Sequence, residues 1–422
     1  MSDFYCRLPL LSTFHYQCSK TSTSKEVASV FDKAIQRQLK VDEKKHKCLV
    51  FMDEAGLPEE DKESLKVLHY YLEGHMSTKA KVGFVAITNH VLDAAKSNRC
   101  VSLLRQQPDD EEMMQIAMGV LYKKRVNNLV SLNGKMIERK DFASRLCSAY
   151  KKILRLNDGE FETFYGLRDF IYLLKYIEQR FEDDEHMTVV KTDILVHALE
   201  RNFNGVDTID LKVIVNEFLV RCFKTEDSIP DAHVQFLLRS PIDVVSEALL
   251  VEETSNARYA LIIDDSDDDS IMRLLKSEGL IDISKKTLFK LSNMPENAAI
   301  ERLSLVSGVK FAALQGSKVV LSQTDAVNES FYDLFNQHFR CIPNRDGDDC
   351  LYVNIAVGGV SRRSKISSSF RCIVYVRKID LKNIPAPFLN QFEKFRFSVR
   401  DLLSSKIRHS PMLTCILGRS ER

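Results

Sequence analysis

The sequence lacks the features that mark a zinc-binding, secreted or membrane-spanning protein. Its ten cysteines are scattered from Cys6 to Cys415, with no CxxC pair and no Cys/His cluster of zinc spacing. No apolar run approaches the length of a membrane span, and Met1–Leu11 has neither the basic start nor the apolar block of a signal peptide. We therefore expect buried free thiols in a cytoplasmic protein, with no RING finger in these residues.

An excess of charge is also missing. The 60 lysines and arginines are balanced by 59 acidic residues, which gives a formal net charge of +1. Such a chain has no general attraction to nucleic acid, and no basic–aromatic patch is visible, so we expect no nucleic-acid partner. With 422 residues, 44% of them hydrophobic, the chain is long enough for two or three globular domains.

The third absence is a phosphate-binding loop, because GxxxxGK[ST] occurs nowhere in the chain. The segment Gly316-Ser317-Lys318 is too short and precedes a predicted strand, whereas such a loop follows a strand and opens a helix. The backbone amides and the lysine of that loop supply much of the affinity for a triphosphate. We therefore expect weak or absent ATP binding by this chain alone.

Apolar strands alternate with helices in the first hundred residues. The predicted strands cover 8–17, 48–52 and 82–88, and a helix with a cap at Ser22, Thr23 or Ser24 is predicted over 25–39. Strands that are apolar on both faces and alternate with helices indicate a parallel sheet covered on both sides.

Helical patterns then dominate from about Asp109 to Leu250, at 110–124, 141–154, 166–180, 191–202 and 209–222. Candidate strands resume after Arg258, at 259–263, 317–321, 351–357 and 370–376. We therefore predict three domains: an α/β core over 1–108, a helical lid and connector over 109–250, and a second, truncated α/β module over 251–422.

The strongest chemical signal is the acid pair Asp53-Glu54, which directly follows the apolar run Leu49-Val50-Phe51-Met52. Ligands of open α/β folds bind at the carboxyl ends of strands, so a buried strand would present both acids at one point. Phosphate hydrolysis needs one acid for the magnesium shell and another to orient a water. We predict that Asp53 holds Mg²⁺ through water and that Glu54 orients the attacking water. The alternative is a strand that ends in a solvated acidic turn.

Three further polar residues are candidates for the same chemistry. Asn89 follows the strand over 82–88, where an amide can place the attacking water or sense the terminal phosphate; alternatively it only forms a turn. Arg99 can serve as an arginine finger for an adjacent module, or it is an ordinary surface arginine. Arg168 opens a helix and can reach back to a phosphate, or it forms a surface pair with Asp169.

The second α/β module lacks these signals. Its first strand runs into Asp264-Asp265-Ser266-Asp267-Asp268-Asp269, and five carboxylates would repel a triphosphate. Their spacing does not fit an EF-hand, so we interpret the segment as a solvated acidic loop. The strand over 317–321 runs into Ser322-Gln323-Thr324-Asp325, which holds no Asp-Glu pair. We therefore predict that this module is degenerate.

These residues carry a resemblance to the mysterin family, giant RING-finger ubiquitin ligases with a dynein-like chain of AAA+ units. Residues 51–106, which contain FMDEAGLPEE and KVGFVAITNH, resemble the second half of one AAA+ unit. The stretch over 165–176 resembles the lid helix of that unit, and 258–397 resembles the next, nucleotide-free unit. Near its end Gln391 stands where the family usually has an arginine before Phe-Glu-Lys, which argues against an arginine finger there.

The resemblance implies an α/β fold class with an incomplete P-loop NTPase-type parallel sheet of the AAA+ kind, a helical lid, and a second degenerate AAA+-like module. It makes Asp53 and Glu54 the Walker B acids, Asn89 sensor 1 and Arg168 sensor 2. It also implies that the family's phosphate-binding loop lies upstream of the first strand and that its RING lies beyond Arg422.

Two functions follow as expectations. The chain is a fragment of a mysterin-like AAA+ ATPase and ubiquitin-protein ligase, with ATP and Mg²⁺ bound only in the full-length protein. Its partners are then the neighbouring AAA+ units and, by resemblance, the ubiquitin machinery. Alternatively, the chain is a non-catalytic AAA+-like scaffold or interaction protein without ATPase activity of its own.

Overall fold

The computed structural model describes most of the chain. The described residues are 10–18, 22–43, 45–56, 58, 64–72, 81–89, 98–123, 128–156, 164–183, 187–206, 208–224, 237–250, 257–266, 268–284, 287–291, 298–343, 349–357 and 360–398. They fall into two compact units. The first unit comprises Met1–Gln106, Asp325–Tyr332 and Asn354–Ser364, and the second comprises Gln107–Thr324, Asp333–Val353 and Lys365–Arg422.

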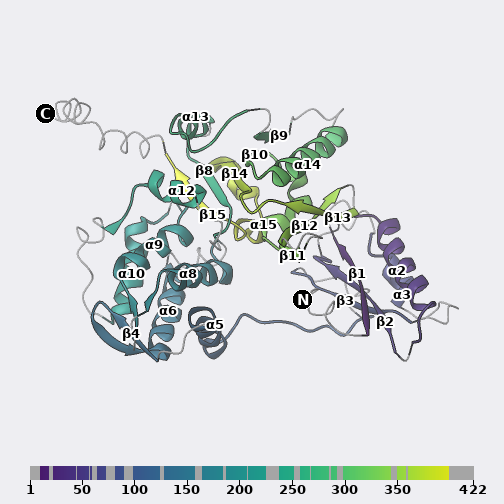
Figure 1. Ribbon diagram of the computed structural model, residues 1–422, viewed down its shortest axis with the longest axis horizontal. Helices are drawn as coiled ribbons and strands as arrows, with labels where there is room; N and C mark the ends of the chain where they lie inside the picture. Colours follow the sequence, from purple (N-terminus) through teal and green to yellow (C-terminus); the bar gives the residue numbers. More distant parts are fainter. Residues whose placement is uncertain are drawn as a thin grey trace. The chain divides into compact units, whose positions relative to one another are not determined.

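The first unit is built on a parallel sheet of three strands in the order β1-β2-β3 (purple in Figure 1). The strands are β1 (Leu11–Gln17), β2 (Lys47–Asp53) and β3 (Gly83–Ala86). The side chains from Cys48 to Met52 are at most 7% exposed, because β2 lies between two strands and under a helix. The predicted parallel sheet is confirmed.

The helix that covers this sheet begins where the sequence predicts it. Helix α2 (Ser24–Gln38) starts at Thr23, whose hydroxyl accepts from the Glu26 amide while the Glu26 carboxylate accepts from the Thr23 amide. This reciprocal capping box satisfies two amides that the first helical turn leaves unpaired. The apolar face of α2 then packs on β1 and β2, and the short helix α3 (Val67–Leu72) lies beside it.

Between Gln107 and Leu250 the described part of the second unit consists mostly of six helices. They are α5 (Asp110–Tyr122), α6 (Arg139–Leu154), α8 (Leu167–Gln179), α9 (Thr192–Asn202), α10 (Leu211–Phe223) and α12 (Pro241–Leu250). The first five pack around one core in which Leu146, Phe170 and Phe218 are fully buried. The helices predicted for this part of the chain are confirmed.

The same part of the chain also holds a four-stranded sheet that the helical interpretation missed. Its order is β5-β4-β7-β6, with β4 (Leu129–Leu132), β5 (Lys135–Glu138), β6 (Glu182–Asp183) and β7 (Met187–Val190). Strands β4 and β5 form a hairpin through Asn133 and Gly134, both at positive φ (49° and 78°). An Asn-Gly pair between two short apolar runs is a strong hairpin signal, so this turn could be predicted.

The second unit contains a larger parallel sheet in the order β15-β8-β14-β10-β9 (green to yellow in Figure 1). Its strands are β8 (Ala260–Asp264), β9 (Leu288–Lys290), β10 (Lys318–Ser322), β14 (Arg371–Arg377) and β15 (Glu393–Phe397). The helices that accompany it are α13 (Ser270–Ser277), α14 (Ala298–Gln315), α15 (Tyr332–Phe335) and α16 (Ala386–Leu389). Within the described ranges, no helix has both the length and the apolar character needed to span a bilayer.

A fourth sheet, in which β11 and β12 are antiparallel, has the order β11-β12-β13. Its strands are β11 (Arg340–Pro343), β12 (Asp349–Val357) and β13 (Val360–Ile366). Two 3₁₀ helices complete the described elements, η4 (Asp325–Phe331) and η5 (Lys378–Asn383).

The two parallel sheets share a local topology. In the second unit β9, β10 and β14 are consecutive strands of their sheet and lie side by side in chain order, as β1, β2 and β3 do in the first unit. The residue directly after the middle strand has a left-handed backbone in both, with φ of 52° at Glu54 and 53° at Gln323. Strand β10 therefore corresponds to β2, and Ser322-Gln323 corresponds to Asp53-Glu54.

The buried thiols predict a pH dependence of stability. Burial raises the pKa of the Cys147 thiol, on α6, to about 11. Between about pH 9 and pH 11 the unfolded thiol therefore loses its proton while the folded thiol keeps it, so the free energy of unfolding falls as the pH rises.

A Cys147→Ala variant isolates this contribution from that of the other thiols. We expect the cost of the substitution to be smaller at pH 10 than at pH 7 by about 1–2 kcal/mol. Urea unfolding of both proteins at the two pH values measures the difference. An equal cost at both would contradict the assignment.

Candidate acid-pair site

The acid pair lies at the carboxyl end of the central strand of the first unit. Asp53 is the last residue of β2 and is paired with Gln17 of β1. On the other side the ladder continues past β3, because the Ile87 amide donates to the Met52 carbonyl (2.9 Å) and the Ala55 amide donates to the Ile87 carbonyl (2.9 Å). Backbone hydrogen bonds on both sides thus fix the position of the two acids.

Two neighbours hold the Glu54 carboxylate, which is only 7% exposed. The Tyr332 hydroxyl donates to Oε1 at 2.7 Å, and the Asn89 side-chain amide lies 3.4 Å from each carboxylate oxygen. Glu54 itself has a left-handed backbone (φ 52°), a conformation that costs a non-glycine residue energy and that is common at functional sites. The backbone conformation and the two contacts together fix the orientation of the Glu54 carboxylate.

The sequence-predicted residues Glu54 and Asn89 are therefore in contact. This follows from the parallel sheet, because Asn89 comes two residues after Ile87, which is level with Asp53 across the ladder. Asn89 is exposed and Asp53 is partly exposed, so both reach solvent at the rim of the sheet. Tyr332 has no local sequence signal, because 278 positions separate it from Glu54 along the chain.

Cys18 is a second residue that sequence reasoning missed. It follows β1 directly, and its amide donates to the Asp53 carbonyl at 2.9 Å. The thiol is 1% exposed, and burial, followed by the charges of Asp53 and Glu54, raises its pKa to about 12. A neutral thiol at this position adds no charge beside the acid pair.

The two predicted arginines lie in separate units. Arg99 is partly exposed in a turn over 98–100 of the first unit. Arg168 is the second residue of α8 in the second unit, where its guanidinium donates to the Asn336 side-chain oxygen at 2.7 Å. The structure thus brings three of the five predicted site residues together within the first unit: Asp53, Glu54 and Asn89.

Asp169 does not form the surface pair with Arg168 that the sequence left open. Its side chain is fully buried, and Oδ1 accepts from Arg258 Nη1 (2.8 Å) and Lys394 Nζ (3.0 Å) while Oδ2 accepts from the Gly166 amide (2.8 Å). Both cations are buried too, at 1% and 0% side-chain exposure. Burial, with help from the nearby Arg258 charge, lowers the pKa of Lys394 to about 8 although Asp169 opposes this.

This buried network gives the last two residues of the Phe392-Glu393-Lys394 segment a structural role. Glu393 accepts from Arg201 Nε at 2.6 Å, and Lys394 also donates to the Phe164 carbonyl at 3.1 Å. Both residues are on β15, whereas Arg201 is on α9. The motif therefore ties the second parallel sheet to the helical part of the same unit.

The second unit has no equivalent of the acid pair. Its counterparts of Asp53 and Glu54 are Ser322 and Gln323. Ser322 pairs with Tyr375 of β14, and Arg377, two residues after Tyr375, is the counterpart of Asn89. Arg377 donates to the Asp380 carboxylate at 2.8 Å. No carboxylate therefore occupies the position at which Glu54 would orient a water.

The prediction of a solvated acidic loop in the second unit is wrong for its first two residues, Asp264 and Asp265. Asp264 is fully buried at the end of β8, where its carboxylate accepts from the Tyr375 hydroxyl and from the amide (2.7 Å) and hydroxyl (2.5 Å) of Ser266. Asp265 accepts from Arg396 Nε at 2.7 Å. Asp267 lies outside the described residues. The start of the segment is a set of structural hydrogen bonds.

Comparison with known proteins is consistent with this architecture. A protein family described as "RNF213 AAA domain" matches residues 1–112, and a second family with the same description matches residues 250–403. The E3 ubiquitin-protein ligase RNF213 of Mus musculus is 25% identical over 418 residues, and that of Homo sapiens is 26% identical over 424 residues. A protein of Dictyostelium discoideum described as an uncharacterized transmembrane protein is 26% identical over 435 residues.

Each of these three alignments covers 95% of the chain but only 7–8% of the relative. A solved structure of Hsp104 in its closed state, with ATPγS and casein, aligns over 94% of the chain and 72% of its own length at 12% identity. Its TM-score of 0.23 carries no argument. The two family matches and the identity to RNF213 bear out the resemblance and show that the chain is an RNF213/mysterin-like AAA region with an AAA+-like α/β fold.

Proposed function

We propose that this region supplies the magnesium- and water-handling residues of an ATP-hydrolysing site within a longer RNF213-like ubiquitin ligase. The observation that carries the proposal is the Glu54 carboxylate, which Asn89 and Tyr332 hold at the carboxyl end of a central parallel strand. The relatives support the larger context, because they are named E3 ubiquitin-protein ligases and the chain spans 8% of their length.

The donor set at this rim fits Mg²⁺–ATP. Hard carboxylate oxygens suit magnesium, which usually keeps several of its waters, and Asp53 presents a partly exposed carboxylate at the end of β2. When bound, Mg²⁺–ATP would supply a phosphoryl group whose charge the metal neutralises. Asp53 would hold a water of the magnesium shell as the first Walker B acid, and Glu54 would orient the attacking water and accept its proton.

The remaining candidates position or complete this pair. Asn89, in the role of sensor 1, restrains the Glu54 carboxylate and reaches solvent beside it. Tyr332 donates to Glu54 and so satisfies one oxygen that would otherwise accept from water. Arg99 would act as an arginine finger toward an adjacent AAA+ unit. Arg168 would act as sensor 2 after exchanging its bond to Asn336 for one to a phosphate.

The proposal extends to the surroundings of the site. ATP and Mg²⁺ would bind in the longer protein, where a phosphate-binding loop outside this chain would supply the missing contacts to the phosphates and neighbouring AAA+ units would be partners. The ubiquitin machinery would be the wider partner, and the cytoplasm the location. The domain division into a core over 1–108, a lid and connector over 109–250, and a degenerate module over 251–422 belongs to the same proposal.

A second candidate function is a non-catalytic AAA+-like scaffold. The observations that favour it are the absence of GxxxxGK[ST] from the 422 residues and the replacement of the acid pair by Ser322 and Gln323 in the second unit. In that case Glu54 and its contacts would only stabilise the fold.

Nucleotide measurements on two proteins separate these functions. By calorimetry, the 422-residue chain is expected to show no micromolar ATP binding at the acid pair, because it has no phosphate-binding loop motif. The longest native polypeptide that contains the chain is expected to bind and hydrolyse ATP in the presence of Mg²⁺. A native polypeptide without ATPase activity would support the scaffold, and micromolar ATP binding by the 422-residue chain that Asp53→Asn weakens would contradict the dependence on a loop elsewhere.

A further inference from the structure

A basic groove lies between two helices of the second unit. None of the residues proposed for ATP hydrolysis lines it. It has a volume of about 640 Å³ and runs between α6 and α10. Eight residues line it: Ser144, Arg145, Ser148, Lys152, Glu217, Val220, Arg221 and Lys224. This volume is in the range of small-molecule sites, but such sites are mostly apolar, whereas four cations line this one.

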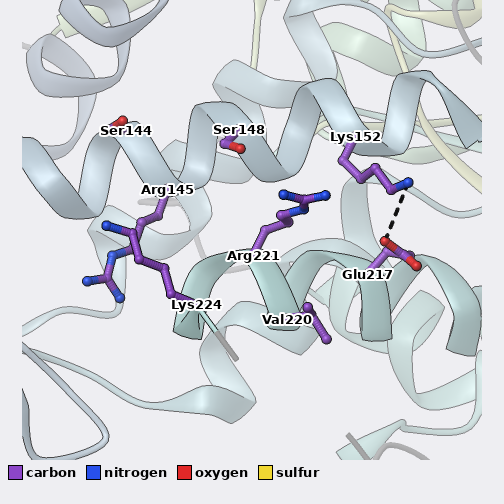
Figure 2. A pocket seen from close by; sticks show the side chains of 8 residues that line it. All are labelled: Ser144, Arg145, Ser148, Lys152, Glu217, Val220, Arg221 and Lys224. Carbon is purple, nitrogen blue, oxygen red and sulfur yellow. Dashed lines mark ion pairs between the residues drawn. The ribbon is translucent and has the colours of Figure 1, made fainter. Parts of the chain in front are cut away.

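The groove follows from helical periodicity. Ser144, Ser148 and Lys152 are spaced by four residues and so share one face of α6. Glu217 and Arg221 share one face of α10 by the same rule, and Lys224 follows directly after the helix. Figure 2 shows the two faces opposed, with the side chains of Arg221 and Lys152 reaching into the space between the helices.

The cations are only partly neutralised. Arg145 and Lys224 both contact Asp141, behind the lining, at 2.6 and 2.9 Å. Lys152 lies 4.0 Å from Glu217 (dashed in Figure 2). With two carboxylates for four cations, the groove keeps an excess of two positive charges.

Arg221 is the cation best placed to bind a ligand. It is exposed, and it forms no hydrogen bond or ion pair with any residue that the structure describes. Arg145, by contrast, is 7% exposed and is held by Asp141 and by the Cys222 carbonyl (3.0 Å). One fixed and one available guanidinium thus line the same groove, together with two serine hydroxyls that can also donate.

From this arrangement we propose that the groove binds a small anion that carries several phosphate groups. Guanidinium and ammonium groups form their strongest hydrogen bonds with phosphate oxygens. Arg145 and Lys152 are seven residues apart on α6, which is about 10 Å along the axis, so a ligand with several phosphate groups can contact cations along the length of the groove. None of the described residues that line the groove is aromatic, so this lining offers no surface for stacking nucleic-acid bases.

Calorimetric titration of the 422-residue chain with inorganic tripolyphosphate at low ionic strength tests the proposal. We expect a dissociation constant in the micromolar range that rises with salt, because the contacts are electrostatic. Parallel titrations with inositol hexakisphosphate and ATP identify which carrier of clustered phosphates binds best. ATP binding that Arg221→Gln weakens belongs to the groove, whereas ATP binding that Asp53→Asn weakens belongs to the acid pair. The failure of this proposal can therefore be told from the failure of the ATPase proposal.

Four variants show whether tripolyphosphate binds in this groove or at other basic residues on the surface. Arg221→Gln is expected to weaken tripolyphosphate binding about tenfold, and Arg221→Gln with Lys152→Gln more than that. Glu217→Gln removes the one carboxylate among the described lining residues and is expected to tighten binding severalfold. The matched control is Lys140→Gln, an exposed lysine of α6 outside the groove, which should leave binding unchanged.

Arg145 is left intact in these variants because its loss would remove the guanidinium that donates to the Cys222 carbonyl and would leave Asp141 with Lys224 alone. Thermal unfolding of each variant checks that the fold is kept. Equal binding by all variants, or no binding below millimolar concentration, would overturn the proposal. A phosphoserine peptide that binds while tripolyphosphate does not would overturn it as well.

Discussion

Replacing Glu54 by glutamine is expected to slow ATP hydrolysis about a hundredfold or more in the native polypeptide that contains this chain. The amide keeps the shape of the side chain but cannot accept a proton from water. ATP binding should persist, because no part of the proposal gives Glu54 a direct phosphate contact. Steady-state phosphate release, measured beside equilibrium binding of labelled ATP, separates the two effects.

Two further variants make this test specific. Tyr332→Phe removes only the hydroxyl that donates to Glu54 at 2.7 Å, so we expect a change in turnover smaller than that of the glutamine variant. Glu138→Gln makes the same chemical change at an exposed glutamate and should have no effect. Normal turnover by Glu54→Gln would show that Glu54 is structural and would favour the scaffold function.

Replacing Asp169 by alanine is expected to lower the free energy of unfolding of the second unit by about 3–5 kcal/mol. The substitution leaves Arg258 and Lys394 as buried cations without the carboxylate that both contact. In the folded protein the attraction of the two cations to Asp169 is only slightly larger than the free-energy cost of burying them. Without Asp169 nothing offsets that cost.

Urea unfolding followed by circular dichroism measures this loss. We expect the transition of the second unit to shift by about 1 M while that of the first unit stays in place. Asp282→Ala, at an exposed aspartate of the second unit, is the matched control and should change stability by less than about 0.5 kcal/mol. A shift no larger than that of the control would contradict the structural role of the buried network.

Much of the candidate site could be predicted because its geometry is local to one sheet. The apolar run before Asp53 predicts a buried strand, and the carboxyl ends of neighbouring parallel strands meet at one edge. The contact between Asn89 and Glu54 follows from those two facts. The boundaries of α6 and α8 could be predicted for a similar reason, because their apolar residues recur with the helical period.

The rest depends on contacts between distant parts of the chain. Tyr332 reaches Glu54 across 278 positions, and nothing near Tyr332 in the sequence indicates it. Asp169 follows an arginine directly, which suggested a surface pair, whereas its true partners are 89 and 225 positions away. Asp264 looked solvated because acids surround it in sequence, yet the Tyr375 hydroxyl and Ser266 satisfy it in the interior.

ATP hydrolysis at the acid pair can be tested by a structure of the longer native polypeptide with Mg²⁺ and a non-hydrolysable ATP analogue. We expect nucleotide beside the end of β2, with a water of the magnesium shell on the Asp53 carboxylate and a second water on Glu54. A metal-bound nucleotide held elsewhere, with both carboxylates turned away from it, would show that the acid pair does not handle the metal or the water.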